Sequence, residues 1–298
     1  MKKIDVFIAQ KIINIFDKYK KLREKPVITR AAWADIIKGR DKIVYDIANG
    51  LKINLYGDSM LSELIYDNFE QMEETFITTY LKEGDIYFDI GANIGFHSLN
   101  AASVLKGNGH IYAFEPTQRT YNRLQENVTL NKLEDTISAL QIGLSDVNTT
   151  LKLNISDGFD ACNSFADLKY IPVNSHIDVS VFTTAHIVAQ ENITVKDIAL
   201  IKLDVEGWEI NVLKGMAPLF EMPEFAPCFL VEFTEENMFR AGYSCRELFN
   251  LIKSKGYEWY NYNHVNNTIT VAELKAYYPH ENLVASKNVE ELTMRLKK

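Results

Sequence analysis

A glycine-containing turn carries the clearest chemical signal in this sequence. Gly91 and Gly95 lie between an expected strand at 86–90 and an expected helix at 94–105. Glycine lets the backbone turn tightly and lets a ligand approach it closely. The start of a helix also offers unpaired N–H groups and a positive dipole end to an anionic group. The turn is therefore predicted to bind a ligand.

The spacing of this turn narrows the class of ligand. A dinucleotide site has the pattern G-x-G-x-x-G, which seats a pyrophosphate, whereas this chain has D-x-G-x-x-x-G from Asp89 to Gly95. The missing middle glycine favours S-adenosylmethionine, which has an adenosine and an amino-acid carboxylate but no phosphate. Asp89 is the candidate for the ammonium group, and Asn93 is the second polar residue of the turn. The alternative is a plain turn in which an Asp or Asn caps the helix.

Two further acids follow the next two expected strands. Glu115 ends a strand at 110–114, where a carboxylate can accept hydrogen bonds from both ribose hydroxyls, and Pro116 stiffens the turn after it. Because the same acid serves NAD, Glu115 indicates an adenosine ligand without separating the two cofactors. Asp146 follows a strand at 137–142 and is either an acceptor for the adenine amino group or a plain turn residue.

A second group of acids ends two buried strands. Asp204 follows an apolar run at 198–203, and Glu232 lies at the end of a run at 228–233. If these strands adjoin, the two carboxylates meet at the carboxyl edge of the sheet, beside the methyl donor. One carboxylate could then deprotonate an acceptor hydroxyl, or both could hold Mg²⁺. In a third interpretation Asp204 caps the next helix and Lys202 pairs with Glu232.

Two other residues are candidates for catalysis. Glu206 lies in the turn after Asp204, and Gly207 permits that turn. His97 lies just inside the helix that follows the glycine turn, where an imidazole could act as a general base at neutral pH. Alternatively, His97 packs near the cofactor or points to solvent.

Alternating strands and helices would position these residues. From about residue 84, short apolar runs alternate with amphipathic segments of helical length, which predicts a parallel sheet covered on both faces. Ligands of such sheets bind at the carboxyl ends of the strands. Further strands are expected at 52–56, 151–153 and 178–182, and a hairpin is expected from 257–262 and 268–271.

Four motifs together resemble the FkbM family of S-adenosylmethionine-dependent methyltransferases. They are FDIGANIGFHS at 88–98, FEP at 114–116, GLSD at 143–146 and IKLDVEGWEINVLKG at 201–215. The likeness covers roughly residues 50 to 262. It implies an α/β, class I methyltransferase (Rossmann-like) fold: a seven-stranded, mostly parallel sheet with helices on both faces and the last strand antiparallel. It also implies methyl transfer to oxygen, often on sugar hydroxyls of glycans or natural products.

The resemblance also suggests a domain division. Residues 1–48 are expected to form a mainly helical N-terminal extension, and residues 49–298 the methyltransferase domain. An insert near 154–176 matches the family poorly, so substrate choice is expected to lie partly there. Isoleucines at helical spacing near the N-terminus predict an amphipathic helix, packed on the body or a second subunit. Its basic residues allow weak contact with a membrane surface as an alternative.

Composition excludes several classes of protein. The 298 residues are 47% hydrophobic and 24% charged, which excludes a disordered or collagen-like chain. The net charge of −8 repels phosphate backbones, so nucleic acid is not an expected partner. Three scattered cysteines predict reduced thiols in a cytoplasmic protein. No apolar run approaches the roughly 18 residues of a membrane span.

These observations favour an S-adenosylmethionine-dependent O-methyltransferase that acts on a hydroxyl of a sugar, glycan or natural product. An NAD-dependent oxidoreductase is the first alternative, and the missing middle glycine counts against it. A non-catalytic module that binds an adenosyl ligand is the second. The acids Asp204, Glu206 and Glu232 count against that module, because pure binding would not need them.

Overall fold

The computed structural model describes most of the chain. Its described residues are 30–47, 50–68, 70–156, 162–166, 173 and 175–297. The predicted N-terminal amphipathic helix and most of the predicted insert lie outside these residues.

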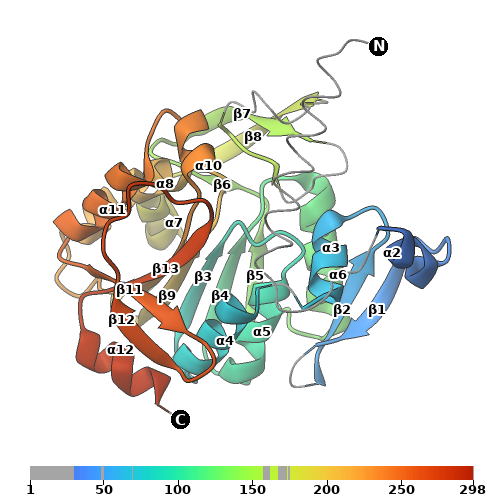
Figure 1. Cartoon of the computed structure of the whole chain (residues 1–298), viewed down its shortest axis with the longest axis horizontal. Coiled ribbons are helices and arrows are strands. Elements are labelled where there is room, and N and C mark those ends of the chain that lie inside the picture. The colour runs from blue at the N-terminus through green and yellow to red at the C-terminus, as the bar shows by residue number, and fades with distance from the viewer. Residues whose placement is uncertain are drawn as a thin grey trace.

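A mixed sheet of eight strands forms the centre of the molecule (Figure 1). Its spatial order is β12-β11-β13-β10-β9-β3-β4-β5. In chain order the strands are β3 (Ile86–Ile90), β4 (His110–Phe114), β5 (Ile137–Leu140), β9 (Ile198–Leu203), β10 (Cys228–Phe233), β11 (Glu258–Asn263), β12 (Thr268–Val271) and β13 (Glu281–Ser286).

The direction of the strands agrees with the predicted class I methyltransferase fold. The five strands from β5 to β10 are parallel to one another. The last strand, β13, is antiparallel to its neighbours, as the family resemblance implies, and it lies between β10 and β11. The expected number of seven strands is too small by one, because β12 forms the predicted hairpin with β11 and thereby extends the edge of the sheet.

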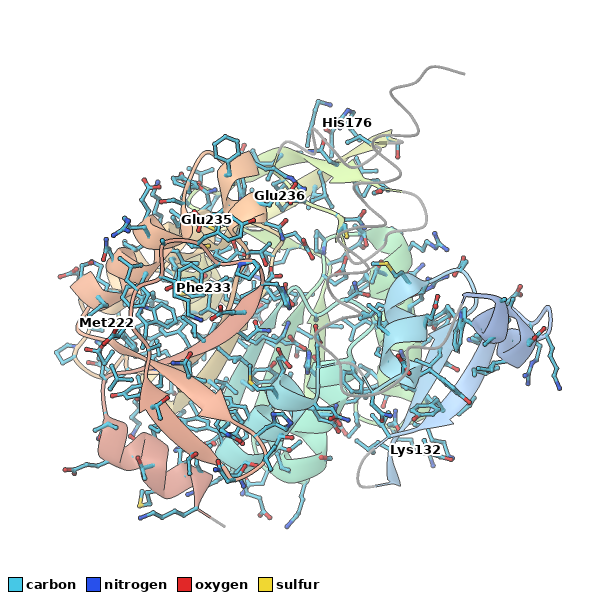
Figure 2. All side chains as sticks on the ribbon, in the orientation of Figure 1. Lys132, His176, Met222, Phe233, Glu235 and Glu236 are labelled. Carbon is cyan, nitrogen blue, oxygen red and sulfur yellow. The ribbon has the colours of Figure 1, made fainter. Side chains whose placement is uncertain are left out.

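Helices cover both faces of this sheet, as predicted, and alternate residues of each strand face opposite sides. On β3, Tyr87 belongs to one buried apolar cluster, and Phe88 and Ile90 belong to the other. Phe233 is likewise buried at the end of β10, whereas Met222 on the preceding loop is exposed (Figure 2). The helices of the body are α4 (Gln71–Tyr80), α5 (Phe96–Leu105), α6 (Gln118–Leu130), α7 (Thr184–Gln190), the 3₁₀ turn η3 (Val195–Asp197), α8 (Glu209–Gly215), α9 (Ala217–Phe220), α10 (Glu235–Arg240), α11 (Cys245–Ser254) and α12 (Val289–Leu296).

Two small sheets flank the large one. Before it in the chain come α2 (Arg30–Ile37), the antiparallel hairpin of β1 (Lys42–Asp46) and β2 (Lys52–Tyr56), and α3 (Met60–Tyr66). After β5 come β6 (Gly143–Leu144), β7 (Thr149–Ile155) and β8 (Ser175–Phe182), in the order β6-β8-β7. The expected strands at 52–56, 151–153 and 178–182 are thus confirmed.

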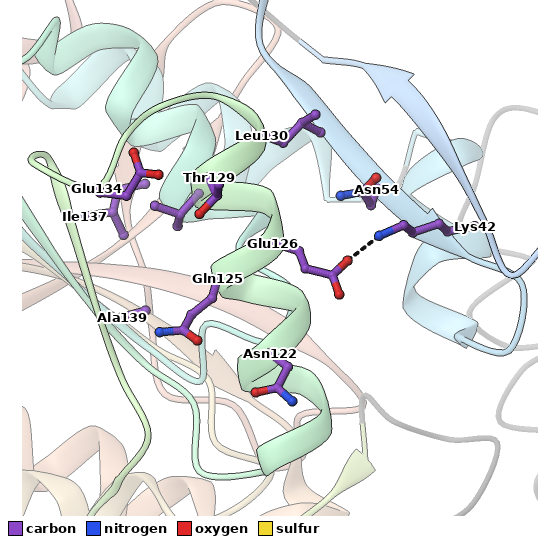
Figure 3. A pocket seen from close by; sticks show the side chains of 11 residues that line it. Lys42, Asn54, Asn122, Gln125, Glu126, Thr129, Leu130, Glu134, Ile137 and Ala139 are labelled. Carbon is purple, nitrogen blue, oxygen red and sulfur yellow. Dashed lines mark hydrogen bonds and ion pairs between the residues drawn. The ribbon is translucent and has the colours of Figure 1, made fainter.

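The β1–β2 hairpin spans the domain boundary that was predicted between residues 48 and 49. β1 precedes residue 48, β2 follows it, and the apolar residues of both pack on the core of the large sheet. A surface groove lies between this hairpin, α6 and β5, where Lys42 forms an ion pair with Glu126 (Figure 3). None of the predicted site residues lines this groove.

Candidate active site

The glycine turn and the turn after β9 touch at the carboxyl edge of the sheet. Gly91 has a φ of +86°, in the left-handed region that favours glycine. A Cβ atom at this position would lie 1.9 Å from the carbonyl oxygen of Asp204, and the Asp204 N–H donates to the Ile90 carbonyl oxygen at 3.2 Å. Only glycine fits here, so the predicted close approach is present.

Helix α5 starts directly after this turn and has no side-chain cap. Gly95, with a φ of +88°, is its N-cap residue. The predicted alternative, in which an Asp or Asn caps this helix, is therefore wrong. Asn93 lies within the turn and also has a positive φ of +48°.

Two polar residues beneath the turn are almost fully buried. Asp89 accepts a 2.6 Å hydrogen bond from the Ser98 hydroxyl through Oδ2, and its Oδ1 has no partner among the described residues. His97 is 6% exposed, so the expectation that it points to solvent is wrong. Its Nε2 lies 2.6 Å from Glu70 Oε2. Burial lowers the pKa of His97, but the hydrogen bond and charge of Glu70 outweigh it, so the pKa is raised.

The acids predicted to hold adenosine lie at the ends of the next strands. Glu115 follows β4 directly and is buried, with Pro116 after it. Its Oε1 accepts from the Thr117 N–H at 2.9 Å and from the Thr117 hydroxyl at 2.6 Å, which fixes the carboxylate. Asp146 is exposed after β6, and its Oδ1 accepts from the Ser145 hydroxyl at 3.1 Å. Their roles in binding ribose and adenine stay predictions.

Three carboxylates meet at the ends of β9 and β10. These strands are parallel neighbours, as expected, and Asp204, Glu206 and Glu232 each place a carboxylate oxygen within 4.8 Å of the others. We call these three residues the acid cluster. Glu235 and Glu236, which open the adjacent helix α10, lie close to the end of β10 (Figure 2).

Each acid of the cluster has a protein partner. Lys202 Nζ donates to Asp204 Oδ2 at 2.8 Å. Burial raises the pKa of Asp204, but the charge of Lys202 outweighs it and the pKa is lowered. The third interpretation of this edge is therefore wrong, because Lys202 pairs with Asp204 rather than Glu232, and helix α8 has no side-chain cap.

Glu206 differs from Asp204 in the direction of its pKa shift. Its Oε2 accepts from the Asn237 amide at 2.8 Å, and its carbonyl oxygen accepts from the Ser164 hydroxyl at 2.7 Å. Burial and the charges of Glu232 and Asp204 raise its pKa well above the ordinary value, which favours the neutral form of this carboxyl over its charged form.

The partner of Glu232 is a residue that sequence reasoning missed. His280 Nδ1 lies 3.0 Å from Glu232 Oε1, and the Thr234 hydroxyl donates to the same oxygen at 3.0 Å. His280 reaches the site because β13 runs antiparallel to β10, with Glu281 opposite Phe233. Burial lowers the pKa of His280, but Glu232 outweighs it and raises the pKa to about 9.

Glu209 and Glu70 were also missed. Glu209 is buried, and its Oε1 accepts from the Val205 and Gly207 N–H groups at 3.1 and 3.2 Å, so it holds the turn of the acid cluster. Burial and the charge of Glu232 raise its pKa to about 8. The quoted motif at 201–215 contains Glu209 and could have drawn attention to it, whereas no motif surrounds Glu70.

Comparison with known proteins identifies the family. The profile of the methyltransferase FkbM domain matches residues 89–259, more than half of the chain. The chain belongs to the FkbM methyltransferase family. Glu70 and His280 lie outside the matched domain, although both contact residues inside it.

Individual relatives of this FkbM chain are distant. The hexuronic acid methyltransferase AglP of Haloferax volcanii is 27% identical over 158 residues, which are 48% of this chain and 55% of the relative. A tRNA(Phe) (4-demethylwyosine(37)-C(7)) aminocarboxypropyltransferase of Pyrococcus horikoshii is 27% identical over 118 residues, 40% of each protein. The chain thus spans about half or less of the length of these curated relatives. A solved O-methyltransferase from Thermotoga maritima has a TM-score of 0.39 and 13% identity, and the match covers 85% of this chain and 80% of that one.

The structure and the comparisons bear on two expectations, one about a membrane span and one about nucleic acid as a partner. No helix in the described part of this FkbM chain is long and apolar enough to cross a membrane. The expected exclusion of nucleic acid gains no support, because one relative is named for a tRNA.

The residues of the FkbM domain fit S-adenosylmethionine. Gly91 and the uncapped start of α5 leave room and N–H groups at the strand end. Asp89 keeps a buried carboxylate oxygen without a partner in the described chain, which suits an ammonium group. Glu115 is held at the neighbouring strand end, at the distance along the chain expected for a ribose ligand.

Mg²⁺ fits the acid cluster less well. The three carboxylates are the oxygen ligands that Mg²⁺ prefers. However, Lys202 and His280 already place positive charge against Asp204 and Glu232. These cations provide the compensation that a bound metal ion would otherwise supply.

Proposed function

We propose that this chain transfers the methyl group of S-adenosylmethionine to a hydroxyl oxygen of a sugar or glycan. The observation that carries the proposal is the acid cluster beside the glycine turn. A donor bound at the turn would present its methyl group to the cluster, where a carboxylate can receive the proton of an incoming hydroxyl. A module that only binds an adenosyl ligand would not require such a group at this place.

Glu232 is the carboxylate best arranged to accept that proton. Its Oε1 is held by Thr234 and His280, whereas Oε2 takes part in no hydrogen bond within the described residues. The raised pKa of Glu206 favours its neutral form, and the charge of Lys202 lowers the pKa of Asp204. We therefore assign Asp204 and Glu206 to positioning the acceptor and Glu232 to proton transfer.

The reaction balances without any further group. The acceptor oxygen forms a bond to the methyl carbon as the bond from that carbon to sulfur breaks, and the hydroxyl proton passes to Glu232 Oε2. Because the sulfonium is already activated, alignment of oxygen, carbon and sulfur supplies much of the acceleration, about 7–11 kcal/mol in favourable cases. General-base catalysis adds about 10²–10⁴-fold.

The proposed acceptor class rests on two considerations. One relative is named a hexuronic acid methyltransferase, which points to a sugar. Uronic acids offer both hydroxyl and carboxylate oxygens, and only a hydroxyl must lose a proton during transfer. A site with a carboxylate placed to accept a proton favours the hydroxyl.

A transfer assay tests the proposal. The full chain would be incubated with methyl-labelled S-adenosylmethionine and a panel of hexose and hexuronic acid glycosides, and products would be separated by mass spectrometry. We expect a sugar product heavier by one CH₂ that resists mild alkali, as a methyl ether does. An alkali-labile product would be a methyl ester and would overturn the hydroxyl assignment. No transfer to any sugar would overturn the acceptor class.

Chelation separates the base from the metal alternative. With Glu232 as base, activity on the sugar acceptor should survive dialysis against EDTA. If activity disappears and returns with added Mg²⁺, the acid cluster is a metal site instead, and Lys202 and His280 do not compensate its charge.

A further inference from the structure

Two buried polar atoms without protein partners lie close to the glycine turn. Asp89 is fully buried and His97 is 6% exposed. Each uses one side-chain atom in a 2.6 Å hydrogen bond, Asp89 with Ser98 and His97 with Glu70. The second atoms, Asp89 Oδ1 and His97 Nδ1, have no partner within hydrogen-bonding distance in the described part of the chain. The Tyr87 hydroxyl is also buried without such a partner, and burial together with its interaction with Asp89 raises the pKa of Tyr87, so this hydroxyl is a second group that Asp89 can hold in place. Buried polar atoms are nearly always paired, so an unpaired set indicates a missing partner.

The two atoms have opposite hydrogen-bonding character. A carboxylate oxygen only accepts hydrogen bonds. The interaction of His97 Nε2 with Glu70 favours the imidazolium, in which Nδ1 is a donor. In support, Glu70 raises the pKa of His97 despite its burial. The pair therefore presents one acceptor and one charged donor, which is the complement of an amino-acid zwitterion.

The start of helix α5 strengthens the donor side of this arrangement. His97 is the second residue of the helix, and the N-cap residue Gly95 has no side chain to cap the first turn. Side chains of a helix tilt toward its N-terminus, so the imidazole leans toward the glycine turn. The free N–H groups and the positive end of the helix also favour an anion there.

Glu70 comes from outside the matched FkbM domain. It precedes helix α4 and has a positive φ of +60°, unusual for a residue other than glycine. Its side chain is 16% exposed and lies against His97 across 27 residues of sequence. Glu70 thus fixes which nitrogen of His97 remains for a ligand.

We propose that His97, oriented by Glu70, binds the carboxylate of the methionine end of the methyl donor, while Asp89 binds its ammonium group. This inference rests on the proposed function, because it requires S-adenosylmethionine at the glycine turn. It replaces the role of general base considered for His97 with a role in donor binding. Glu70 is a positioning residue that acts through the imidazole.

Four ligands separate the contributions of the parts of the donor to binding. S-Adenosylhomocysteine carries the whole amino-acid end, and 5′-methylthioadenosine lacks it. Decarboxylated S-adenosylmethionine, compared with S-adenosylmethionine itself, lacks only the carboxylate. Their dissociation constants would be measured by calorimetry on the full chain and on His97→Gln, Glu70→Gln and His110→Gln. His110 is a suitable control because its imidazole also forms a hydrogen bond with a side chain, that of Ser138. However, His110 is the first residue of β4, and the glycine turn lies at the carboxyl ends of the strands.

We expect His97→Gln to weaken the binding of S-adenosylhomocysteine by about 10–100-fold, the usual range for a hydrogen bond to a charged group. The dissociation constant of 5′-methylthioadenosine should stay within about twofold of its value in the parent. The preference of the parent for S-adenosylmethionine over its decarboxylated form should shrink by a similar factor. Glu70→Gln should weaken the binding of S-adenosylhomocysteine by about 3–10-fold, and His110→Gln should change the affinity for neither ligand.

Several results would overturn the assignment. If His97→Gln loses affinity equally for S-adenosylhomocysteine and 5′-methylthioadenosine, the role of His97 is structural. If it loses affinity for neither ligand, His97 has no role in binding the donor. If His97→Gln does not fold, the same ligand comparison in Glu70→Gln decides the question. If the parent binds none of the adenosyl ligands, the proposed function fails as well. If it binds them without regard to the carboxylate, only this inference fails.

Discussion

The glycine turn and the acid cluster lie at the same edge of the sheet but satisfy their polar groups differently. Around the turn, Asp89 and His97 each leave a buried atom without a partner in the described residues. In the acid cluster every carboxylate has a protein partner, and Lys202 and His280 supply two cations. The turn is thus arranged to receive charges from a ligand, whereas the cluster balances its own charge before a substrate arrives.

The two regions also differ in how the chain builds them. Asp89 to His97 are local in sequence, on a strand end, a turn and the first turn of a helix. The acid cluster and its partners come from β9 and the turn after it, from β10, from α10 and from the segment before β13, and Glu232 and His280 are 48 positions apart. Local chain geometry makes the first region, and sheet pairing makes the second.

We expect the largest effect from a substitution at Gly91, where the glycine turn touches the turn that contains Asp204. Gly91→Ala would place a Cβ atom 1.9 Å from the Asp204 carbonyl oxygen at a φ of +86°. We expect a loss of about 3 kcal/mol in the free energy of unfolding and no measurable binding of S-adenosylhomocysteine. Urea denaturation and calorimetry would measure both.

Gly84→Ala is the matched control for this change. Gly84 has a similar φ of +94°, but the Cβ atom that alanine would add there meets no atom within 4 Å beyond its chain neighbours. We expect a loss of about 1 kcal/mol and unchanged ligand affinity. If Gly91→Ala behaves like Gly84→Ala, the two turns are not in contact.

Amide substitutions in the acid cluster should affect turnover rather than donor binding. Glu232→Gln keeps the shape of the side chain but removes its basicity, so we expect turnover to fall by about 10²-fold or more. Asp204→Asn should also lower turnover by about 10²-fold, because Lys202 would lose the negative charge of its partner beside the acceptor. The affinity for S-adenosylhomocysteine should stay within a few-fold in both variants.

Glu236→Gln is the control for these variants. Glu236 lies near the end of β10, but it pairs with Arg240 on its own helix at 3.0 Å. Its substitution should leave turnover unchanged. Full turnover of Glu232→Gln and Asp204→Asn on the true acceptor would show that the cluster is structural.

The ribose assignment predicts a smaller effect, confined to binding. Glu115→Ala should weaken S-adenosylhomocysteine by about 10–100-fold and reduce the rise in melting temperature that this ligand causes. It should weaken 5′-methylthioadenosine equally, because both ligands contain the ribose. Thr117→Val removes one of the two hydrogen bonds to Glu115 Oε1 and should weaken the binding of both ligands by about 2–5-fold. Unchanged affinity in Glu115→Ala would refute the assignment.

The smallest predicted effect is a dependence of stability on pH. His280 has a pKa raised to about 9 in the folded chain, so its contribution is complete below its ordinary value of 6.5 and is lost as the pH rises through about 9. Glu209, with a pKa raised to about 8, acts in the same direction, because its charged form is disfavoured by burial. Both groups make the fold less stable at pH 9 than at pH 6.

Urea denaturation at several pH values measures this dependence. We expect His280 to contribute up to about 3 kcal/mol of the change, and His280→Gln to flatten the profile above pH 6.5. Glu209→Gln should remove the second contribution. A parent protein more stable at pH 9 than at pH 6 would contradict both assignments.

Much of the fold and part of the site could be predicted from the sequence. The D-x-G-x-x-x-G turn and the parallel strands follow from local patterns, because glycine conformations and strand alternation are properties of short segments. The contact of Asp204 with Glu232 was predicted on the condition that their strands adjoin, and the pairing of β9 with β10 meets that condition. One interpretation of the sequence paired Lys202 with Glu232, and only the distances in the folded chain show that its partner is Asp204.

Glu70, His280 and the strand at 281–286 could not be predicted. Glu70 precedes a helix in a stretch without clear periodicity, and His280 stands in a tail whose pairing no local pattern reveals. The sequence by itself determined a glycine turn, its adjacent acids and the class of sheet. The tertiary structure alone decided that β13 enters between β10 and β11 and brings His280 to Glu232, because strand order in a sheet depends on pairing between distant segments.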